Sequence, residues 1–285
     1  MYSMNIIPIA DLNNKELDIY ARLSETQLLH YNEPKPGLFI AESPNVIRMA
    51  VAAGYEPVSL LVEEERLEKE AGPVINCIKE KIGEETADGL PVYIAKREIL
   101  KELTGYALVR GLWGAFKRKL MQDIRTFCTD KDNLAILYNI VNPTNVGAIT
   151  RSAAALGMDG MIATYDTVNP LSRRSARVSM GTVFQIPWTT AGRSEAESAS
   201  LIATLKSLEY TTVAMALTHE ARGIDDPLLK SHKRKAVILG TEGYGLPKEV
   251  IEASDYTVKI PMHHGVDSLN VAAASAVCFW ELMRC

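Results

Sequence analysis

Several signals that would place a protein in a membrane, a secretion route or a disulfide-rich class are missing from this sequence of 285 residues. No apolar run approaches the roughly 20 residues that a membrane-spanning helix needs. The opening "MYSMNIIPIADLNNKE" lacks the basic start and long apolar stretch of a signal peptide. The four cysteines are far apart and form neither a CxxC pair nor a zinc spacing. We therefore expect a soluble, cytoplasmic protein whose thiols stay reduced and carry no chemistry.

Signatures of nucleotide-dependent and metal-dependent enzymes are also missing. The glycine-rich stretch "GTEGYGL" (240–246) is not followed by Lys-Ser or Lys-Thr, as a P-loop would be, and it lacks the G-x-G-x-x-G spacing of dinucleotide sites. His263 and His264 are adjacent but have no third ligand at helical spacing, so we predict no metal site. No nucleophile, His and Asp set can be argued from the order of residues. A nucleotide-dependent metabolic enzyme with a doubly wound sheet is therefore a weak alternative.

Basic charge is scarce overall and unevenly distributed. The formal net charge is −4, and residues 1–110 hold 12 Lys and Arg against 18 Asp and Glu, whereas the remainder holds 19 against 17. Three basic clusters stand out: "RGLWGAFKRK" (110–119), "RRSAR" (173–177) and "KSHKRK" (230–235). Such clusters are usually solvated surface, but three of them permit contacts with the phosphate backbone of a nucleic acid.

The first part of the chain alternates between apolar strands and short helices. The pattern predicts strands at 37–43, 57–65 and 91–96 and helices at 44–55, 73–83 and 97–105. This alternation is typical of a small α/β domain. We therefore predict an N-terminal α/β domain over 1–110 and a linker over 111–133.

The pattern sharpens in the second part, over 134–285. Strands are expected at 134–142, 161–166, 182–188, 210–218, 235–242 and 256–262, with helices at 143–157, 195–208, 247–254 and 269–283. Strands that alternate with helices predict an α/β fold with a mostly parallel sheet and helices on both faces. Ligands usually bind at the carboxyl ends of such strands.

Three motif-like stretches fall at these strand ends. In "NPTNVGAITRSAAALG", Asn145 can cap the following helix and Arg151 follows six residues later, but each can equally be a plain cap or a solvated charge. In "GTEGYGL", the glycines permit close backbone approach, while Glu242 either accepts bonds from backbone donors or faces water. In "DSLNVAAASA", Asp267 or Ser268 is the candidate N-cap, and the small residues let another backbone pack closely.

Together these stretches resemble the motifs of the SpoU (TrmH-like) RNA methyltransferases of the SPOUT class, over about residues 134–285. The family's first motif, Asn-x-Gly-Ala-x-x-Arg, appears as "NVGAITR" (145–151). The second, Gly-x-Glu-Gly-x-Gly-Leu, is complete as "GTEGYGL", and the third is "SLNV" (268–271). "RVSMGTVFQIPW" (177–188) is similar to the family's stretch leading into its next strand. Ala272 stands where this family often has Ser, which removes a possible hydroxyl contact.

The N-terminal part carries a second resemblance. Residues 37–65 look like part of the small α/β RNA-binding domain that many of these enzymes have, and "GYALVRGLWGAFKRK" (105–119) resembles its closing segment. The resemblance therefore implies that the N-terminal domain binds the RNA substrate.

The family resemblance also implies a cofactor and its site. SpoU enzymes bind S-adenosyl-L-methionine in a cleft made by a C-terminal trefoil knot. Carried onto this sequence, the implied cofactor-binding residues are Leu239, Gly240, Gly243, Ile260, Met262 and Leu269. The implied catalytic residues are Asn145, Arg151, Glu242, Ser268 and Asn270.

The implied reaction is methyl transfer to a ribose 2′-hydroxyl of RNA, ribosomal rather than transfer RNA, by a homodimer without a metal or membrane partner. A guanidinium group is effectively always protonated, so Arg151 is expected to fix a phosphate and polarise the hydroxyl rather than act as a base. Asn145 and Asn270 would orient groups around the methyl, Ser268 would bond Arg151 or substrate, and Glu242 would brace the site. The alternatives are a tRNA 2′-O-methyltransferase and a catalytically inactive, ribosome-associated RNA-binding factor of the same fold.

Overall fold

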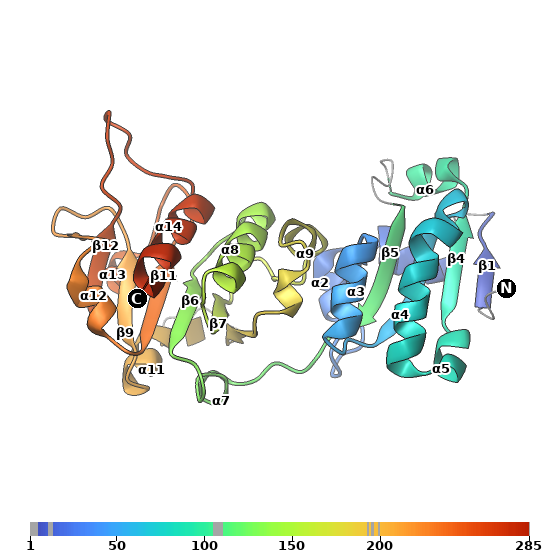
Figure 1. Cartoon of the computed structure of the whole chain (residues 1–285), viewed down its shortest axis with the longest axis horizontal. Helices are drawn as coiled ribbons and strands as arrows, with labels where there is room; N and C mark the ends of the chain where they lie inside the picture. Colours follow the sequence, from blue (N-terminus) through green and yellow to red (C-terminus); the bar gives the residue numbers. More distant parts are fainter. Residues whose placement is uncertain are drawn as a thin grey trace. The chain divides into compact units, whose positions relative to one another are not determined.

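The computed structural model divides into two compact units (Figure 1). The first takes in the chain up to Leu120 together with Leu171–Phe184, and the second takes in Met121–Pro170 together with the chain from Gln185 onward. The structure describes residues 5–10, 14–104, 111–192, 194, 197–198 and 200–284. Within these ranges, no helix is both long enough and apolar enough to cross a lipid bilayer.

The first unit contains a mixed five-stranded sheet in the order β1-β4-β3-β5-β2. Its strands are β1 (Asn5–Pro8), β2 (Leu38–Glu42), β3 (Pro57–Glu63), β4 (Pro91–Ala95) and β5 (Leu112–Lys117). Its α-helices are α1 (Asp18–Ala21), α2 (Glu25–Leu29), α3 (Pro44–Ala52), α4 (Gly72–Ile82), α5 (Glu84–Asp88), α6 (Arg97–Thr104) and α9 (Arg173–Val178). It also has the 3₁₀ turns η1 (Lys15–Leu17), η2 (Glu64–Arg66) and η4 (Thr182–Phe184) and the short π-helix η3 (Leu67–Ala71). The alternation expected between residues 37 and 104 is confirmed, while residue 105 of the expected last helix lies outside the described residues.

Strand β5 occupies part of the range 111–133 that the sequence predicts to be a linker. It runs antiparallel to both β2 and β3 in the interior of the sheet. Leu112, Trp113 and Phe116 are fully buried, because the apolar run "LWGAF" presents side chains to both faces. The connection to the second unit is therefore shorter than the sequence predicts, and it begins after β5.

The Leu171–Phe184 segment belongs to the first unit, although it lies in sequence between two strands of the second. Its helix α9 packs against β2, where Arg177 donates two bonds of 3.1 Å to the carboxylate of the buried Glu42. The guanidinium group of Arg173 lies 4.3 Å from the centre of the Trp113 ring. These contacts show why "RRSAR" folds with the N-terminal sheet rather than standing free in solvent.

The strand expected over 182–188 is wrong. The chain instead forms the 3₁₀ turn η4 directly after Gly181, whose φ of 85° lies in the left-handed region that favours glycine. Pro187 has no N–H to donate to a strand ladder, and β8 begins only after it, at Trp188. The next strand of the second unit therefore starts at residue 188 rather than at residue 182.

The second unit contains a wholly parallel seven-stranded sheet in the order β10-β12-β9-β11-β6-β7-β8. Its strands are β6 (Asn133–Leu137), β7 (Gly160–Thr164), β8 (Trp188–Ala191), β9 (Thr211–Met215), β10 (Arg222–Gly223), β11 (Lys235–Leu239) and β12 (Tyr256–Lys259). Its helices are α7 (Ile124–Phe127), α8 (Pro143–Ala155), α11 (Leu201–Ser207), α12 (Pro227–Ser231), α13 (Lys248–Ala253) and α14 (Val271–Met283). The expected parallel sheet is confirmed; of the helix expected over 195–208, residues 195, 196 and 199 lie outside the described residues.

Helices cover both faces of this sheet, as the continuous apolar strands predict. Val237 and Leu239 of β11 enter one core with α8 and α14, which lie side by side (Figure 1). Ala236 and Ile238 of the same strand enter a second core with α11 and α13. Alternate residues of this strand are thus buried on opposite faces of the sheet, so both of its faces are covered.

Three of the four cysteines lie among the described residues. Cys77, Cys128 and Cys278 are free thiols, and Cys285 lies outside the described residues. Burial raises the pKa of the Cys128 and Cys278 thiols, so both stay protonated near neutral pH. A protonated, buried thiol is a poor nucleophile and a poor metal ligand.

Candidate functional site

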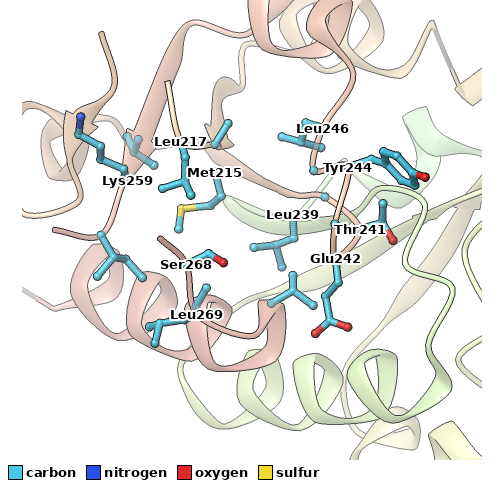
Figure 2. A pocket seen from close by; sticks show the side chains of 18 of the residues that line it. Met215, Leu217, Leu239, Thr241, Glu242, Tyr244, Leu246, Lys259, Ser268 and Leu269 are labelled. Atoms are coloured by element: carbon cyan, nitrogen blue, oxygen red, sulfur yellow. The ribbon is translucent and has the colours of Figure 1, made fainter. Parts of the chain in front are cut away.

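A pocket of about 570 Å³ opens at the carboxyl ends of β9, β11 and β12 in the second unit (Figure 2). Because parallel strands end at one edge of the sheet, the segments that follow them converge there. Residues of four segments, 215–218, 239–246, 258–262 and 268–274, form most of its wall. The wall includes the residues predicted to hold the cofactor, which are Leu239, Gly240, Gly243, Ile260, Met262 and Leu269.

The pocket wall is mostly apolar and carries a few polar groups at its rim. Met215, Leu239 and Leu269 extend apolar side chains into the cavity from three different segments (Figure 2). The side chains of Glu242 and Ser268 supply oxygen atoms. This composition is typical of a site for a small molecule that is part planar ring and part polar.

The glycine-rich turn after β11 is held in a tight conformation. The Gly245 N–H donates to the Thr241 carbonyl at 3.0 Å, and the two residues form an isolated antiparallel bridge. Gly243 and Gly245 have φ of 93° and 68°, which glycine adopts without steric cost. A Cβ at Gly240 would lie 2.6 Å from the carbonyl carbon of Gly245 and 2.7 Å from the Leu246 nitrogen. Only glycine at position 240 therefore lets the turn fold back onto the strand end.

Asn270 joins the three motif stretches. Its Oδ1 accepts the N–H groups of Ala272 at 2.9 Å and Ala273 at 3.4 Å, which makes it the N-cap of α14. Since Oδ1 faces the helix, Nδ2 points away from it and donates to Asn145 Oδ1 at 3.2 Å and to Glu242 Oε1. The carboxamide thus uses both of its donor hydrogens and both of its acceptor positions. One residue from each motif is fixed in a single hydrogen-bonded cluster.

Asn145 does not cap α8, contrary to the prediction. The N-cap is Asn142, whose side chain accepts the Thr144 N–H at 2.9 Å. An N-cap has extended backbone and precedes the helix, and Pro143 occupies the first helical position here, so the cap falls one residue before it. Asn145 lies in the first turn instead, only 6 % exposed, and its side-chain oxygen accepts the bond from Asn270.

Arg151 lies further along α8 and does not join this cluster. Six residues of helix place it about 9 Å along the axis from Asn145 and about 240° around it. It is exposed, it is not part of the pocket wall, and its side chain makes no ion pair or hydrogen bond with the described residues. Of the predicted catalytic residues, the structure therefore brings Asn145, Glu242 and Asn270 together, places Ser268 in the pocket wall, and leaves Arg151 facing solvent.

The residues before α14 form an exposed loop rather than the first helical turn. The helix begins at Val271, so the predicted caps Asp267 and Ser268 are wrong. His263 and His264 lie in this loop with their ring centres 6.4 Å apart, and both are exposed. In the part of the chain that the structure describes, no group of three or more His, Cys, Asp or Glu residues is placed to hold a metal ion.

One wall of the pocket was not predicted from sequence. Met215, the last residue of β9, and residues 216–218 after it line the cavity, and Met215 extends into it (Figure 2). The stretch "YTTVAMALT" carries no polar motif that would single it out. Its contribution follows only from the strand order, because β9 pairs with β11 and β12 and ends beside both of them.

The basic clusters are largely engaged in contacts within the chain. Hydrogen bonds to carboxylates or backbone carbonyls are made by Lys117, Arg118, Lys119, Arg173, Arg177, Lys230, Arg234 and Lys235. Lys233, by contrast, has a side chain that is 85 % exposed, and Arg110 lies outside the described residues. The clusters that the sequence offers as phosphate contacts therefore serve mainly to hold the fold.

Comparisons with known proteins agree with this geometry. A family model described as the SpoU rRNA Methylase family matches residues 132–280, which include the Asn270 cluster and the whole pocket wall. The chain is 28% identical over 282 residues to an uncharacterized tRNA/rRNA methyltransferase of Mycobacterium tuberculosis, a match that covers 99% of this chain and 93% of the relative.

Two further proteins bear on the reaction and on the fold. The chain is 32% identical over 151 residues to the 23S rRNA (guanosine-2′-O-)-methyltransferase RlmB of Bordetella pertussis, a match that covers 53% of this chain and 59% of the relative. An AdoMet-bound rRNA methyltransferase from Sinorhizobium meliloti is similar in structure, with a TM-score of 0.76 and 21% identity, over 98% of this chain and 97% of that one. At that identity the likeness concerns the fold, and it extends over both units.

Proposed function

The chain belongs to the SpoU rRNA methylase family, and we propose that it transfers a methyl group from S-adenosyl-L-methionine to a ribose 2′-hydroxyl of RNA. The observation that carries this proposal is the meeting of one residue from each family motif at the Asn270 side chain, on the rim of the pocket. The similarity to a guanosine-2′-O-methyltransferase over 151 residues supports the ribose hydroxyl as the acceptor.

The pocket fits this methyl donor. Its volume of about 570 Å³ lies within the range of roughly 300–1,000 Å³ that is usual for small-molecule sites. The apolar side chains of Met215, Leu239 and Leu269 suit the faces of an adenine ring, and Gly240 leaves backbone accessible at the wall. The carboxylate of Glu242 complements a positively charged ligand. When bound, the donor supplies an electrophilic methyl group on a cationic sulfur.

Most of the proposed catalysis is positioning by this chain's own residues. Asn145 is buried and fixed by Asn270, which in turn holds the Glu242 carboxylate in one orientation. A well-oriented acceptor and donor need little further chemical assistance. Ser268 contributes a hydroxyl to the pocket wall for a bond to substrate.

Arg151 is proposed to handle the acceptor nucleotide. Its exposed guanidinium group is suited to a bidentate contact with an RNA phosphate, and from there it polarises the 2′-hydroxyl. Because guanidinium stays protonated, the hydroxyl proton leaves through the phosphate or water rather than through Arg151.

We infer that ribosomal RNA is the substrate and that the enzyme works in the cytoplasm. The printed names of the Bordetella and Sinorhizobium relatives support ribosomal RNA, while that of the Mycobacterium relative includes transfer RNA as well. The first unit, with its own sheet and core, is proposed to bind the RNA. Transfer RNA is kept as the alternative.

We further propose a trefoil knot and a homodimer formed through α14. The convergence of 239–246, 258–262 and 268–274 on one pocket supports a threaded C-terminal segment. On α14, Val277 is 40% exposed and Trp280 is 56% exposed, although apolar side chains of this size are usually buried. A second copy of this face would cover them.

Trp280→Glu tests the dimer. The substitution replaces an apolar ring with a charged group that would lose its hydration in the interface, so we expect the variant to sediment as a monomer where the unaltered protein sediments as a dimer. Leu120→Glu, at a side chain that is 82% exposed and lies outside α14, serves as the control and should leave the sedimentation coefficient unchanged. A monomeric unaltered protein would contradict the proposal.

Two substitutions of Asn270 separate its structural role from its role in the site. Asn270→Ala removes the α14 cap and should lower the free energy of unfolding by about 1 kcal/mol in a urea titration. Asn270→Asp keeps an oxygen for the cap but cannot donate to Asn145 and faces the Glu242 carboxylate. We therefore expect the Asp variant to unfold at a higher urea concentration than the Ala variant. Both variants should transfer methyl more slowly than the unaltered protein, and at about the same rate as each other. Wild-type transfer by either variant would show that the cluster has only a structural role.

A binding titration tests the proposed function against its alternatives. An active methyltransferase should bind S-adenosyl-L-methionine and then label RNA with its methyl group. A ribosome-associated factor would bind RNA without transferring methyl, and a nucleotide-dependent enzyme would bind a nucleotide in place of the methyl donor. Calorimetry with each ligand, followed by a transfer assay, distinguishes these three results, and only the first agrees with the proposal.

A further inference from the structure

We propose that Tyr244 stacks on an unpaired base next to the methylated nucleotide, so that this enzyme acts on single-stranded RNA. The inference rests on the proposed function, because it takes the pocket behind Tyr244 to be the methyl-donor site. It concerns which RNA structure enters the site, which neither the motifs nor the pocket determines.

Tyr244 is exposed to an unusual degree for an aromatic residue. Its relative exposure is 98%, so virtually the whole ring is in solvent, directly beside the pocket wall. Single exposed apolar residues are normal on protein surfaces and need no explanation by themselves. The position of this one in a hydrogen-bonded turn at the rim of the proposed active site is what calls for a function.

The turn directs the Tyr244 ring into solvent rather than onto the protein surface. Gly243 and Gly245 flank it with left-handed backbone, and the Gly245 N–H is bonded to the Thr241 carbonyl at 3.0 Å. Glu242 and Tyr244 leave the turn in different directions, and the ring points away from the cavity (Figure 2). The carboxylate is thus directed into the Asn270 cluster while the phenol faces solvent at the pocket entrance.

A second exposed tyrosine lies at the same edge of the sheet. Tyr165 directly follows β7 and is 59% exposed. Strand β6 lies between β11 and β7, and the register aligns Leu239, Leu137 and Ala163 across the three strands. The ends of β11 and β7 are therefore about 10 Å apart, which is twice the usual strand spacing. Between them, β6 leads into α8, the helix that carries Asn145 and Arg151. The two exposed tyrosines therefore follow the strands on either side of the one that leads into this helix.

The exposed side chains at this edge of the sheet, Tyr244 and Tyr165, are better suited to bind unpaired bases than the sugar-phosphate backbone of a duplex. Every nucleobase has a π-face that an aromatic ring can stack on, and proteins that bind single strands use such rings. Duplex RNA buries those faces and offers mainly phosphates and 2′-hydroxyls, which call for cations. In this chain the cationic groups of the basic clusters are largely bonded internally, whereas the two tyrosine rings are available.

Fluorescence anisotropy with two defined RNAs tests the inference. The probes are a fluorescein-labelled oligoadenylate of twelve nucleotides, about the length that one single-strand site covers, and the same strand paired with oligouridylate. We expect the unaltered protein to bind the single strand more tightly than the duplex. Stacking of one base predicts that Tyr244→Ala raises the Kd for the single strand by about 10- to 100-fold.

Three further variants identify the interaction. Tyr244→Trp keeps an aromatic face and should bind the single strand about as well as the unaltered protein, whereas Tyr244→Leu keeps only apolar area and should bind as weakly as Tyr244→Ala. Leu228→Ala, at an exposed apolar residue of α12 that is not part of the pocket wall, is the control and should leave the Kd unchanged. Calorimetry with S-adenosyl-L-methionine verifies that the pocket of each variant is still formed.

Several results would overturn the inference: unchanged single-strand binding by Tyr244→Ala, equal binding by the Leu and Trp variants, or preference of the unaltered protein for the duplex. A change in sedimentation on Tyr244→Ala would assign the ring to a protein interface instead. Methyl transfer to total RNA separates this inference from the proposed function. If the unaltered protein transfers methyl and Tyr244→Ala does so with the same KM for RNA, only the stacking inference fails; if the unaltered protein transfers none, the proposed function fails whatever the anisotropy shows.

Discussion

Arg151→Ala is expected to reduce methyl transfer by about 1,000-fold, the loss typical of removing one preorganised group that stabilises the transition state, while the methyl donor still binds. The two effects separate because Arg151 is exposed on α8 and contributes nothing to the wall of the donor pocket. Its proposed role is confined to the RNA side of the reaction, where it holds a phosphate and polarises the 2′-hydroxyl.

The measurement is incorporation of label from S-adenosyl-L-methionine into RNA, together with donor affinity by calorimetry. Arg151→Lys retains the charge but not the planar fork of donors, so we expect it to recover only part of the activity. Arg125→Ala removes an exposed arginine from α7, outside the site, and should transfer methyl normally. Normal transfer by Arg151→Ala would rule out the assigned role.

Gly240→Ala is expected to reduce donor affinity more than any other small substitution in the pocket. The added methyl group would lie 2.6 to 2.8 Å from backbone atoms of Gly245 and Leu246, which cannot rotate away as a side chain would. Overpacking of this kind costs about 1–3 kcal/mol. The turn must therefore move off the end of β11, and the pocket wall moves with it.

Calorimetry should then show at least about a 10-fold rise in the donor Kd, corresponding to about 1.4 kcal/mol, and thermal unfolding should show a lower Tm. Gly89→Ala is the matched control, because its added Cβ meets nothing closer than 3.6 Å and its φ is −78°. Wild-type donor affinity in Gly240→Ala would mean that the pocket at the end of β11 is not the donor site.

Much of the fold is predictable because the strands carry a strong local signal. Continuous apolar runs such as 236–239 predict a parallel sheet that is covered on both faces, and the structure has both features. What the sequence does not show is where a segment packs. Strand β5 lies in the range predicted to be a linker, and the Leu171–Phe184 segment lies in the range predicted to be the second domain. Both nevertheless fold with the N-terminal sheet. Long-range contacts such as Arg177 with Glu42 decide this, and no periodicity reveals them.

In the candidate site, too, the features set by local sequence are predictable and those set by long-range contacts are not. The second and third motifs predict part of the pocket wall, because residues 240–246 and 268–271 line it, whereas the first motif contributes no lining residue. The predicted caps lie two or three residues from the observed ones, because Asn142 and Asn270 compete with nearby polar residues that are equally good cap formers. The contribution of 215–218 depends on strand order alone, and the engagement of the basic clusters depends on tertiary partners.

The most direct test of the central claim is to locate the transferred methyl group. Total RNA is incubated with the protein and labelled S-adenosyl-L-methionine and is then hydrolysed in alkali, which cleaves RNA only where a free 2′-hydroxyl can attack the neighbouring phosphate. A ribose 2′-O-methyltransferase leaves the label in alkali-resistant dinucleotides. Label recovered in mononucleotides, as methylation of a base would give, or no label in any RNA despite donor binding, would contradict the account.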